Sequence, residues 1–257
     1  MGLLAFSGDN KLMSYPTDLL FYASVDSSLD ADYGNDPTNH TETSGIAINT
    51  SQFNCGTGSV KLPSQPAPNN TKILTYWNQY TPSQQFTAAY YAYVPTHTAR
   101  TFADFYFYTY ENSNLIVWLQ LFQNAGATLT IFQLLDSLGN ILVDTTGGTF
   151  PLDSWVHVEI NYDADAGTAM VFIDGVVDIS ASYTPTSIGP DAHARYRWLA
   201  SSQSPPSPSL DIFYDDMQVY DTVQHSSGFS SACASFGPSY TPGLTFGYPF
   251  GQKGFSR

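Results

Sequence analysis

The chain has 257 residues and a formal net charge of −14, with only eight Lys and Arg side chains. So acidic a chain repels a phosphate backbone, which argues against nucleic-acid binding. Only 12% of the residues are charged, and no apolar run is long enough to form a transmembrane helix. The 18 Tyr and 17 Phe favour strands, while 19 Gly and 16 Pro favour turns, so we expect an all-β fold.

Residues 1–16 are expected to form an arm rather than a structural element, ahead of the first strand at residues 18–25. They also lack the basic and apolar segments of a signal peptide, so we expect no export signal in the chain. Further short strands are expected at residues 45–48 and 59–62.

An acidic loop follows the first strand. It holds four carboxylates within eleven residues, those of Asp26, Asp30, Asp32 and Asp36. Calcium takes about six to eight oxygen ligands in flexible geometry, so this loop supplies part of a coordination shell, with Asp26 and Asp32 as its first ligands. The alternative is that these carboxylates cap turns and keep the surface soluble.

Aromatic side chains form a second candidate site, for a ligand rather than a metal. Its members are Tyr76, Trp77, Tyr80, Tyr91 and Tyr93. Tyr and Trp rings stack against the apolar faces of sugars when polar groups lie beside them. The alternative is that these rings belong to the core or to a subunit contact.

Strands with an alternating pattern dominate the middle of the chain. They are expected at residues 86–94, 101–110, 115–122, 128–135 and 141–144, with turn signals between them. This spacing is typical of a β-sandwich. Residues 115–122 are apolar on both sides, so both sides are expected to be covered, either by the core and long loops or by a partner subunit.

A hairpin near residue 165 carries the most specific pattern. Residues 155–163 read WVHVEINYD, and residues 169–177 read AMVFIDGVV after a short turn. Apolar residues alternate along both strands, and Asp174-Gly175 suits a type I′ turn, in which both residues have positive φ. The pattern resembles the hallmark hairpin of concanavalin A-like, laminin-G-like domains.

The flanking segments extend this resemblance. Residues 19–29 look like the opening strand and acidic loop of that family, and residues 211–220 look like its closing strand. The resemblance implies a concanavalin A-like antiparallel β-sandwich, or jelly roll, over residues 17–225. We expect extended arms on either side, at residues 1–16 and in the Gly/Pro/aromatic segment 226–257.

No catalytic residues are expected. Retaining glycoside hydrolysis needs two carboxyls about 5–5.5 Å apart, and glucanases of this fold carry them on one strand. The candidates are three widely separated glutamates and a closing-strand trio with the wrong spacing: Glu42, Glu111, Glu159, Asp211, Asp215 and Asp216. An enzyme built on Asp215 or Asp216 is therefore only a third alternative.

The two cysteines are Cys55 and Cys233. The first and last strands of a jelly roll can be neighbours, so a disulfide is geometrically possible. We expect two free thiols instead, because isolated cysteines in a reducing compartment are more often small buried residues.

These observations favour a non-enzymatic structural or binding protein. The leading hypothesis is a homo-oligomeric component of a virus particle, such as a bacteriophage capsid-decoration, fibre or tail accessory protein. Its arms would dock on neighbouring subunits and its lectin-like domain would contact host glycans. The hypothesis rests on the missing export signal, the two-sided apolar strands and the aromatic arm. The alternative is a free, extracellular carbohydrate-binding module or lectin, with or without Ca2+; neither hypothesis involves nucleic acid or membrane insertion.

Overall fold

The computed structural model describes twelve stretches of the chain: residues 4–6, 12–14, 19–32, 35–64, 71–78, 84–96, 100–109, 115–124, 127–135, 140–184, 194–203 and 210–221. All regular elements in these stretches are strands. Within the same stretches, no helix is long and apolar enough to cross a membrane.

Seven strands form the first sheet, in the spatial order β12-β11-β10-β9-β16-β7-β4. Their bounds are β4 Asn35–Glu42, β7 Lys72–Asn78, β9 Arg100–Thr109, β10 Leu115–Asn124, β11 Ala127–Leu135, β12 Ile141–Thr146 and β16 Ala194–Gln203. The three central strands β16, β9 and β10 are also the longest of this sheet, with ten residues each.

Eight strands form the second sheet, in the order β15-β14-β13-β8-β17-β6-β5, with β3 paired to β17 outside this path. Their bounds are β3 Leu19–Ala23, β5 Ala47–Asn49, β6 Ser59–Ser64, β8 Gln85–Tyr93, β13 Trp155–Asp163, β14 Thr168–Ile173, β15 Val176–Ser182 and β17 Leu210–Tyr220.

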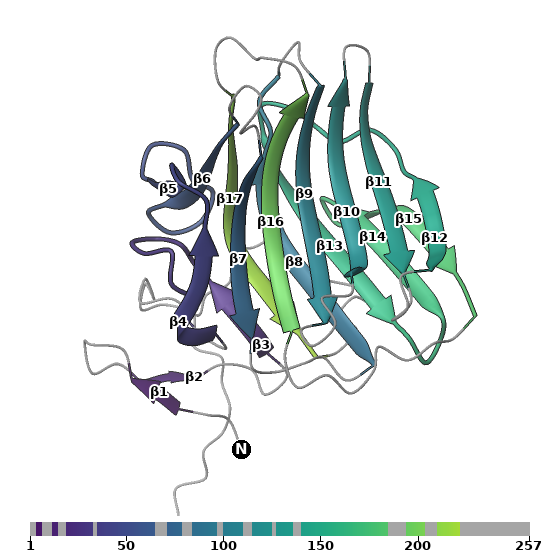
Figure 1. The fold of residues 1–257 in the computed structure, drawn as a ribbon, viewed down its shortest axis with the longest axis horizontal. Coiled ribbons are helices and arrows are strands. Elements are labelled where there is room, and N and C mark those ends of the chain that lie inside the picture. The colour runs from purple at the N-terminus through teal and green to yellow at the C-terminus, as the bar shows by residue number, and fades with distance from the viewer. Residues whose placement is uncertain are drawn as a thin grey trace, which may run out of the picture.

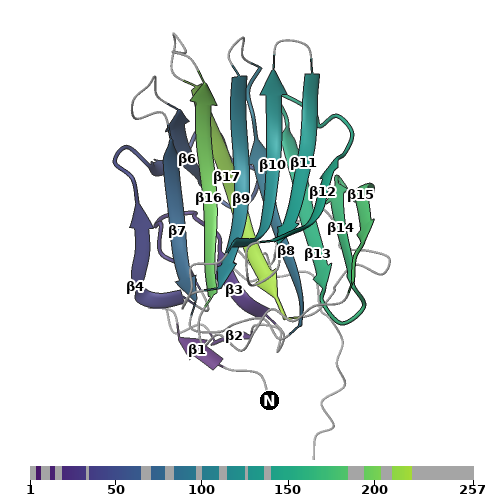
Figure 2. The same ribbon diagram turned by 45° about the vertical axis from the view of Figure 1, so that its right-hand side comes forward.

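The two sheets lie one behind the other as the layers of a sandwich (Figure 1 and Figure 2). Every pairing among the described strands is antiparallel. The all-β, antiparallel sandwich expected from the sequence is therefore confirmed.

Aromatic rings from both sheets fill the space between the layers. Trp198 of β16 is fully buried and stacks on Phe21 of β3, with ring centroids 5.9 Å apart. The rings of Tyr76 and Tyr90 meet Trp198 edge-on, at 5.9 and 6.1 Å. Edge-to-face rings pack densely without voids, so this cluster joins β3, β7, β8 and β16 into one core.

The hairpin that suggested the fold is present. Residues 158–163 of β13 pair with residues 168–173 of β14. The turn after β14 places Asp174 at φ 50° and Gly175 at φ 76°. Both turn residues have positive φ, as the Asp-Gly pair predicts. The Asp174 carboxylate also accepts a 2.8 Å hydrogen bond from the backbone amide of His157, which fixes the turn to β13.

Strand β17 changes its partner halfway along. It pairs with β6 up to Tyr214 and with β3 from Met217 onward. Its pairing with β8 is irregular between Asp215 and Gln218, and Asp216 has φ 49°, a value uncommon for a residue other than glycine. A bulge of this kind bends a strand, which lets β17 follow two short neighbours in turn.

The two terminal segments expected to form arms differ in how far the structure describes them. Within the segment expected to be an arm, β1 (Leu4–Phe6) and β2 (Leu12–Ser14) pair as a small antiparallel sheet. The segment 226–257 lies outside the described residues.

The expectation of free thiols is wrong for Cys55, which is disulfide-bonded. The only other cysteine in the sequence, Cys233, lies outside the described residues. The error has a physical reason: bonding depends on the distance between two sulfurs in the fold, and their separation in sequence does not report that distance.

Candidate functional site

The acidic loop uses its carboxylates to hold the backbone. Asp26 accepts hydrogen bonds from the amides of Thr57 and Gly58, and Asp32 accepts one of 2.7 Å from the amide of Ser24. Among the described residues, no three His, Cys, Asp or Glu side chains come together as a metal site.

The other two residues predicted to bind calcium, Asp30 and Asp36, give no further support for a metal site. Asp30 accepts a 2.6 Å hydrogen bond from the Ser28 hydroxyl, and the side chain of Asp36 lies outside the described residues. Calcium binding by this loop stays a prediction of the sequence.

The five aromatic residues predicted to bind a ligand do not share one surface. Tyr76 lies on β7, has no exposed surface, and donates its hydroxyl proton to the Leu29 carbonyl. Tyr91 and Tyr93 lie on β8, in the other sheet. Tyr76 is therefore a core residue; Tyr80 and the side chain of Trp77 lie outside the described residues.

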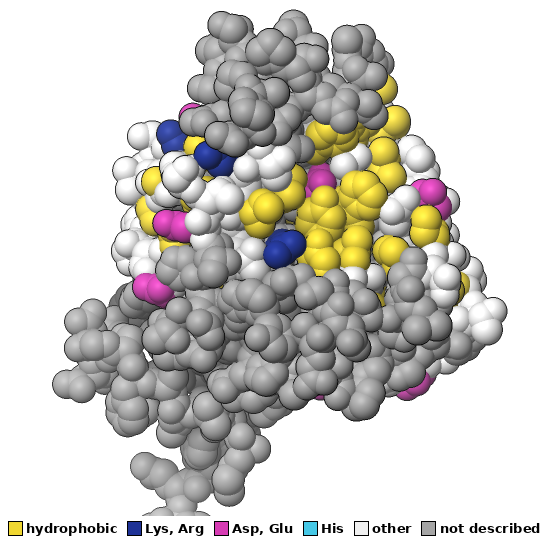
Figure 3. Space-filling model, viewed as in Figure 1, with side chains coloured by type: hydrophobic (Ala, Val, Ile, Leu, Met, Phe, Trp, Pro, Cys, Tyr) yellow, Lys and Arg dark blue, Asp and Glu magenta, His cyan; other side chains and the backbone are white. Residues whose placement is uncertain are grey.

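A different surface gathers aromatic and polar side chains on the outer side of the seven-stranded sheet. We call it the Asp104 face, after the residue at its centre. Strand register places its members side by side on β9, β10, β11 and β16: Phe102, Asp104, Tyr106, Tyr108, Trp118, Gln120, Phe122, Ile131, Arg197 and Leu199. Figure 3, viewed toward this sheet, shows hydrophobic side chains over its middle strands, with acidic and basic side chains among them.

Alternation along the strands produces this surface. On β9, Ala103, Phe105 and Phe107 point into the core, so the residues between them face outward. On β10, Leu119 and Leu121 are in the core in the same way. The outward side of these strands is thus as aromatic as the inward side, which explains why the sequence is apolar on both faces.

Asp104 is the central polar group of this face and is only 2% exposed. Its Oδ2 atom accepts hydrogen bonds from the Tyr106 hydroxyl (2.8 Å), the Trp118 indole Nε1 (3.3 Å) and the Gln120 amide (3.3 Å). Its Oδ1 atom is buried and has no hydrogen-bond partner. A buried acceptor without a partner is costly, so a donor that reached this oxygen would be stabilised by it.

Burial also changes the acidity of Asp104. Desolvation raises the pKa of its carboxyl from 3.8 to about 7, against the lowering effect of the hydrogen bonds from Tyr106, Gln120 and Trp118. The charged form is penalised by the loss of water, and no cation among the described residues offsets this effect on the pKa. The face therefore centres on a carboxyl that changes charge near neutral pH.

The rings that surround Asp104 are held by one another. Tyr106 and Trp118 are cross-strand neighbours whose rings lie 5.8 Å apart and nearly parallel, at 11°. Tyr108 also stacks on Tyr106, with ring centroids 5.9 Å apart. All three rings are partly exposed. The result is a row of prearranged aromatic groups beside a buried hydrogen-bond acceptor.

Arg197 adds a positive charge to the row. It lies opposite Tyr106 in the register of β16 and β9, and its guanidinium sits over the Tyr108 ring, 4.9 Å from the ring centroid. A guanidinium that stacks on an aromatic ring lies parallel to it, so the N–H groups at its edge can still bind an anion.

This arrangement suits binding better than hydrolysis. Asp104 is the only carboxylate in the sequences of β9, β10, β11 and β16. Asp144 lies on β12, three strands from β9, which corresponds to about 14 Å at the usual strand spacing. Two carboxyls that far apart cannot act as the pair of a retaining glycosidase, which needs about 5–5.5 Å.

The closing-strand carboxylates have structural partners. Asp215 accepts hydrogen bonds from the backbone amides of Asn54 and Cys55. Asp216 accepts one of 3.0 Å from the side-chain amide of Gln218. Both aspartates are buried in the other sheet. The contacts of these two carboxylates thus hold the β17 bulge and the loop beside it.

Sequence reasoning did not identify the Asp104 face as a site. The alternation of Phe102, Asp104, Tyr106 and Tyr108 was visible within one strand. The sequence does not report the cross-strand register, which brings Trp118 and other residues of β10 and β16 beside these four residues of β9.

Comparison with known proteins agrees with this architecture. Residues 55–226 match a laminin-G-type family model described as the concanavalin A-like lectin/glucanases superfamily. Comparison with curated proteins gave no match.

Several solved structures share the fold. The carbohydrate recognition domain of Emp47p superposes with a TM-score of 0.56 at 14% identity, over 82% of this chain and 100% of that one. The botulinum neurotoxin type G receptor-binding domain gives 0.55 at 12% identity, over 82% of this chain and 49% of that one. A botulinum neurotoxin type C structure, from work on its interaction with two ganglioside molecules, gives 0.58 at 10%, over 81% and 49%. The chain thus spans about half the length of the toxin chains, and these identities show the fold alone.

Proposed function

Because this chain belongs to the concanavalin A-like lectin/glucanases superfamily, we propose that it is a carbohydrate-binding domain that binds sugars on the Asp104 face without cleaving them. The observation that carries the proposal is the unpartnered Asp104 Oδ1 beside the stacked rings of Tyr106 and Trp118. A sugar offers both complements at once, a hydroxyl for the carboxyl oxygen and an apolar C–H face for the rings.

The similar structures support a binding role. One is a carbohydrate recognition domain, another is a toxin receptor-binding domain, and a third comes from work on ganglioside interaction. The single carboxylate of the central strands supports binding without hydrolysis. A purely apolar partner would leave the Asp104 oxygen buried and unpartnered, whereas a sugar hydroxyl would satisfy it.

The proposal is tested by applying the whole chain to an array of neutral and acidic oligosaccharides, followed by titration calorimetry with the glycan that binds best. Trp118→Ala should weaken binding about five- to thirtyfold, since a ring contact is worth roughly 1–2 kcal/mol. Phe53→Ala is the matched control, because Phe53 is an exposed aromatic (40%) outside this face. Absence of binding to every glycan, or equal affinity for wild type and Trp118→Ala, would overturn the proposal.

We also keep the proposal that the domain acts within a virus particle as a homo-oligomer. Its support is the sequence alone: strands that are apolar on both faces, and a Gly/Pro/aromatic segment at residues 226–257 suited to docking. Light scattering of the full chain and of a chain lacking residues 226–257 tests the assembly. A defined oligomer that dissociates on truncation supports a homo-oligomer within a particle. A monomer in both forms favours a free extracellular lectin.

A further inference from the structure

We infer that Arg197 makes the Asp104 face selective for sugars that carry a carboxylate. This inference rests on the proposed function and goes beyond it, because it names the chemical class of the ligand.

The first ground is that Arg197 has no counter-ion among the residues that the structure describes. The chain has 22 Asp and Glu for eight Lys and Arg, so a guanidinium has many possible partners. Among the described residues the ion pair that forms is Lys61–Asp211, at 3.5 Å, in the other sheet. The Arg197 Nε atom is buried and has no hydrogen-bond partner. The Arg197 side chain as a whole is partly exposed, so an acceptor from outside can meet its guanidinium.

The second ground is that the guanidinium is held in place. It lies over the Tyr108 ring at 4.9 Å, and the register of β7, β16 and β9 puts Thr75 and Tyr106 on either side of Arg197. Its planar fork of N–H groups matches the two oxygens of a carboxylate, which gives charge-assisted hydrogen bonds about twice as strong as neutral ones. Preorganisation removes part of the entropy cost of binding.

The third ground is that Asp104 does not neutralise Arg197. Among the described residues, the donors to Asp104 Oδ2 are neutral groups, from Tyr106, Trp118 and Gln120. A guanidinium partner would lower the pKa of this carboxyl, yet burial raises it to about 7. Arg197 and Asp104 are thus two separate functional groups of one surface.

Their spacing suits one sugar residue. In the β16–β9 register Leu199 is opposite Asp104 and Arg197 is opposite Tyr106, so Arg197 and Asp104 are diagonal neighbours. Diagonal neighbours lie about 7–8 Å apart, with long side chains able to shorten the distance. One acidic sugar can then place its carboxylate on Arg197, a hydroxyl on Asp104 Oδ1 and its apolar face on the rings between them.

The test compares two probes that differ at one group, a carboxylate in the first and its uncharged methyl ester in the second. A uronic-acid oligosaccharide and its methyl ester are titrated into wild type, Arg197→Gln and Arg197→Lys, alongside an array of matched acidic, sulfated and neutral glycans. Wild type should prefer the acid over the ester at least tenfold. Arg197→Gln should lose this preference while still binding the ester, and Arg197→Lys should recover only part of it, because Lys keeps the charge without the fork. Lys61→Gln, which removes a charge from the other sheet, should change nothing.

The failure of this inference differs from the failure of the proposed function. If wild type binds neutral glycans as well as acidic ones, and Trp118→Ala weakens both, the proposed function stands and the role of Arg197 is wrong. The same holds if Arg197→Gln keeps the preference for the acid. Equal preference for sulfated and carboxylated sugars would overturn the fit to a carboxylate in favour of general anion binding. If no glycan binds at all, both proposals fail together.

Discussion

The Asp215 carboxylate accepts a 2.7 Å hydrogen bond from the backbone amide of Cys55, a residue 160 positions earlier in the chain. The same oxygen accepts a second bond, of 2.8 Å, from the amide of Asn54. Asp215 is fully buried at the bulge of β17. One side chain thus ties the closing strand of the sandwich to the loop that carries the disulfide-bonded Cys55.

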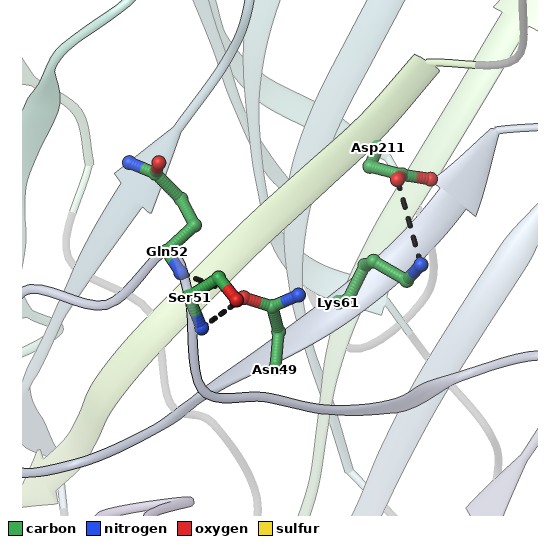
Figure 4. Close-up of polar contacts among 5 residues, drawn as sticks. All are labelled: Asn49, Ser51, Gln52, Lys61 and Asp211. Atoms are coloured by element: carbon green, nitrogen blue, oxygen red, sulfur yellow. Dashed lines mark hydrogen bonds and ion pairs between the residues drawn. The ribbon is translucent and has the colours of Figure 1, made fainter.

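Replacing Asp215 by Ala should destabilise the protein by about 2–3 kcal/mol, because two amide donors would lose their acceptor. Urea unfolding followed by circular dichroism measures the loss. The control is Asp211→Ala on the same strand, whose ion pair with Lys61 is partly exposed (Figure 4) and is worth less than about 1 kcal/mol. Equal losses for the two variants would show that the Asp215 bonds add nothing.

The disulfide at Cys55 should contribute separately. Cys55→Ser should lower the free energy of unfolding by about 2–4 kcal/mol, since a disulfide restricts the unfolded chain. Adding dithiothreitol should lower wild-type stability by a similar amount and leave the variant unchanged. A wild type insensitive to the reductant, with the thiols confirmed as reduced by mass spectrometry, would contradict this contribution.

Two glycines with positive φ should respond very differently to substitution. A Cβ added to Gly56 (φ 60°) would lie 1.9 Å from Asp26 Oδ1, whereas one added to Gly175 (φ 76°) would meet nothing within 4 Å. Gly175→Ala should therefore cost only the backbone strain, about 1 kcal/mol. Gly56→Ala should cost roughly 3 kcal/mol, because Asp26 must also leave the amides of Thr57 and Gly58. Thermal unfolding compares them, and equal losses would contradict the Asp26 contact.

The parts of the fold that are local in sequence could be predicted. The hairpin of β13 and β14 needs only alternation and an Asp-Gly turn, and both are properties of a single short segment. The Asp104 face needs the register between strands far apart in the chain, which places Gln120 and Leu199 on either side of Asp104. Nothing in the sequence of β9 alone reports those neighbours.

The choice between the two alternatives for Tyr76, ligand contact or core, could not be made from the sequence for a related reason. Both sides of the central strands are aromatic, so the residue type did not distinguish an inward ring from an outward one. The core contact of Tyr76 with Trp198, at 5.9 Å, joins residues more than a hundred positions apart. The Cys55 disulfide was missed for the same reason, since spacing in sequence does not report distance in the fold.

The buried carboxyl of Asp104 should make stability depend on pH. Its pKa is about 7 in the folded chain and 3.8 is its ordinary value, so the unfolded state ionises first as the pH rises. Folding stability should then fall between about pH 4 and pH 7 and level off above, because the folded state holds a proton that the unfolded state has lost. The difference between 3.8 and about 7 corresponds to roughly 4 kcal/mol.

Asp104→Asn isolates this effect. The amide oxygen of Asn can still accept the bonds from Tyr106, Trp118 and Gln120, while no charge has to be buried. The variant should therefore match wild type near pH 4 and exceed it increasingly up to pH 7. Asp215, whose pKa burial also raises to about 7, is present in both proteins and cancels in the comparison. Urea unfolding at a series of pH values gives the difference directly. A difference that stays constant from pH 4 to pH 8 would mean that Asp104 titrates alike in the folded and unfolded chain, and that its burial carries no penalty for charge.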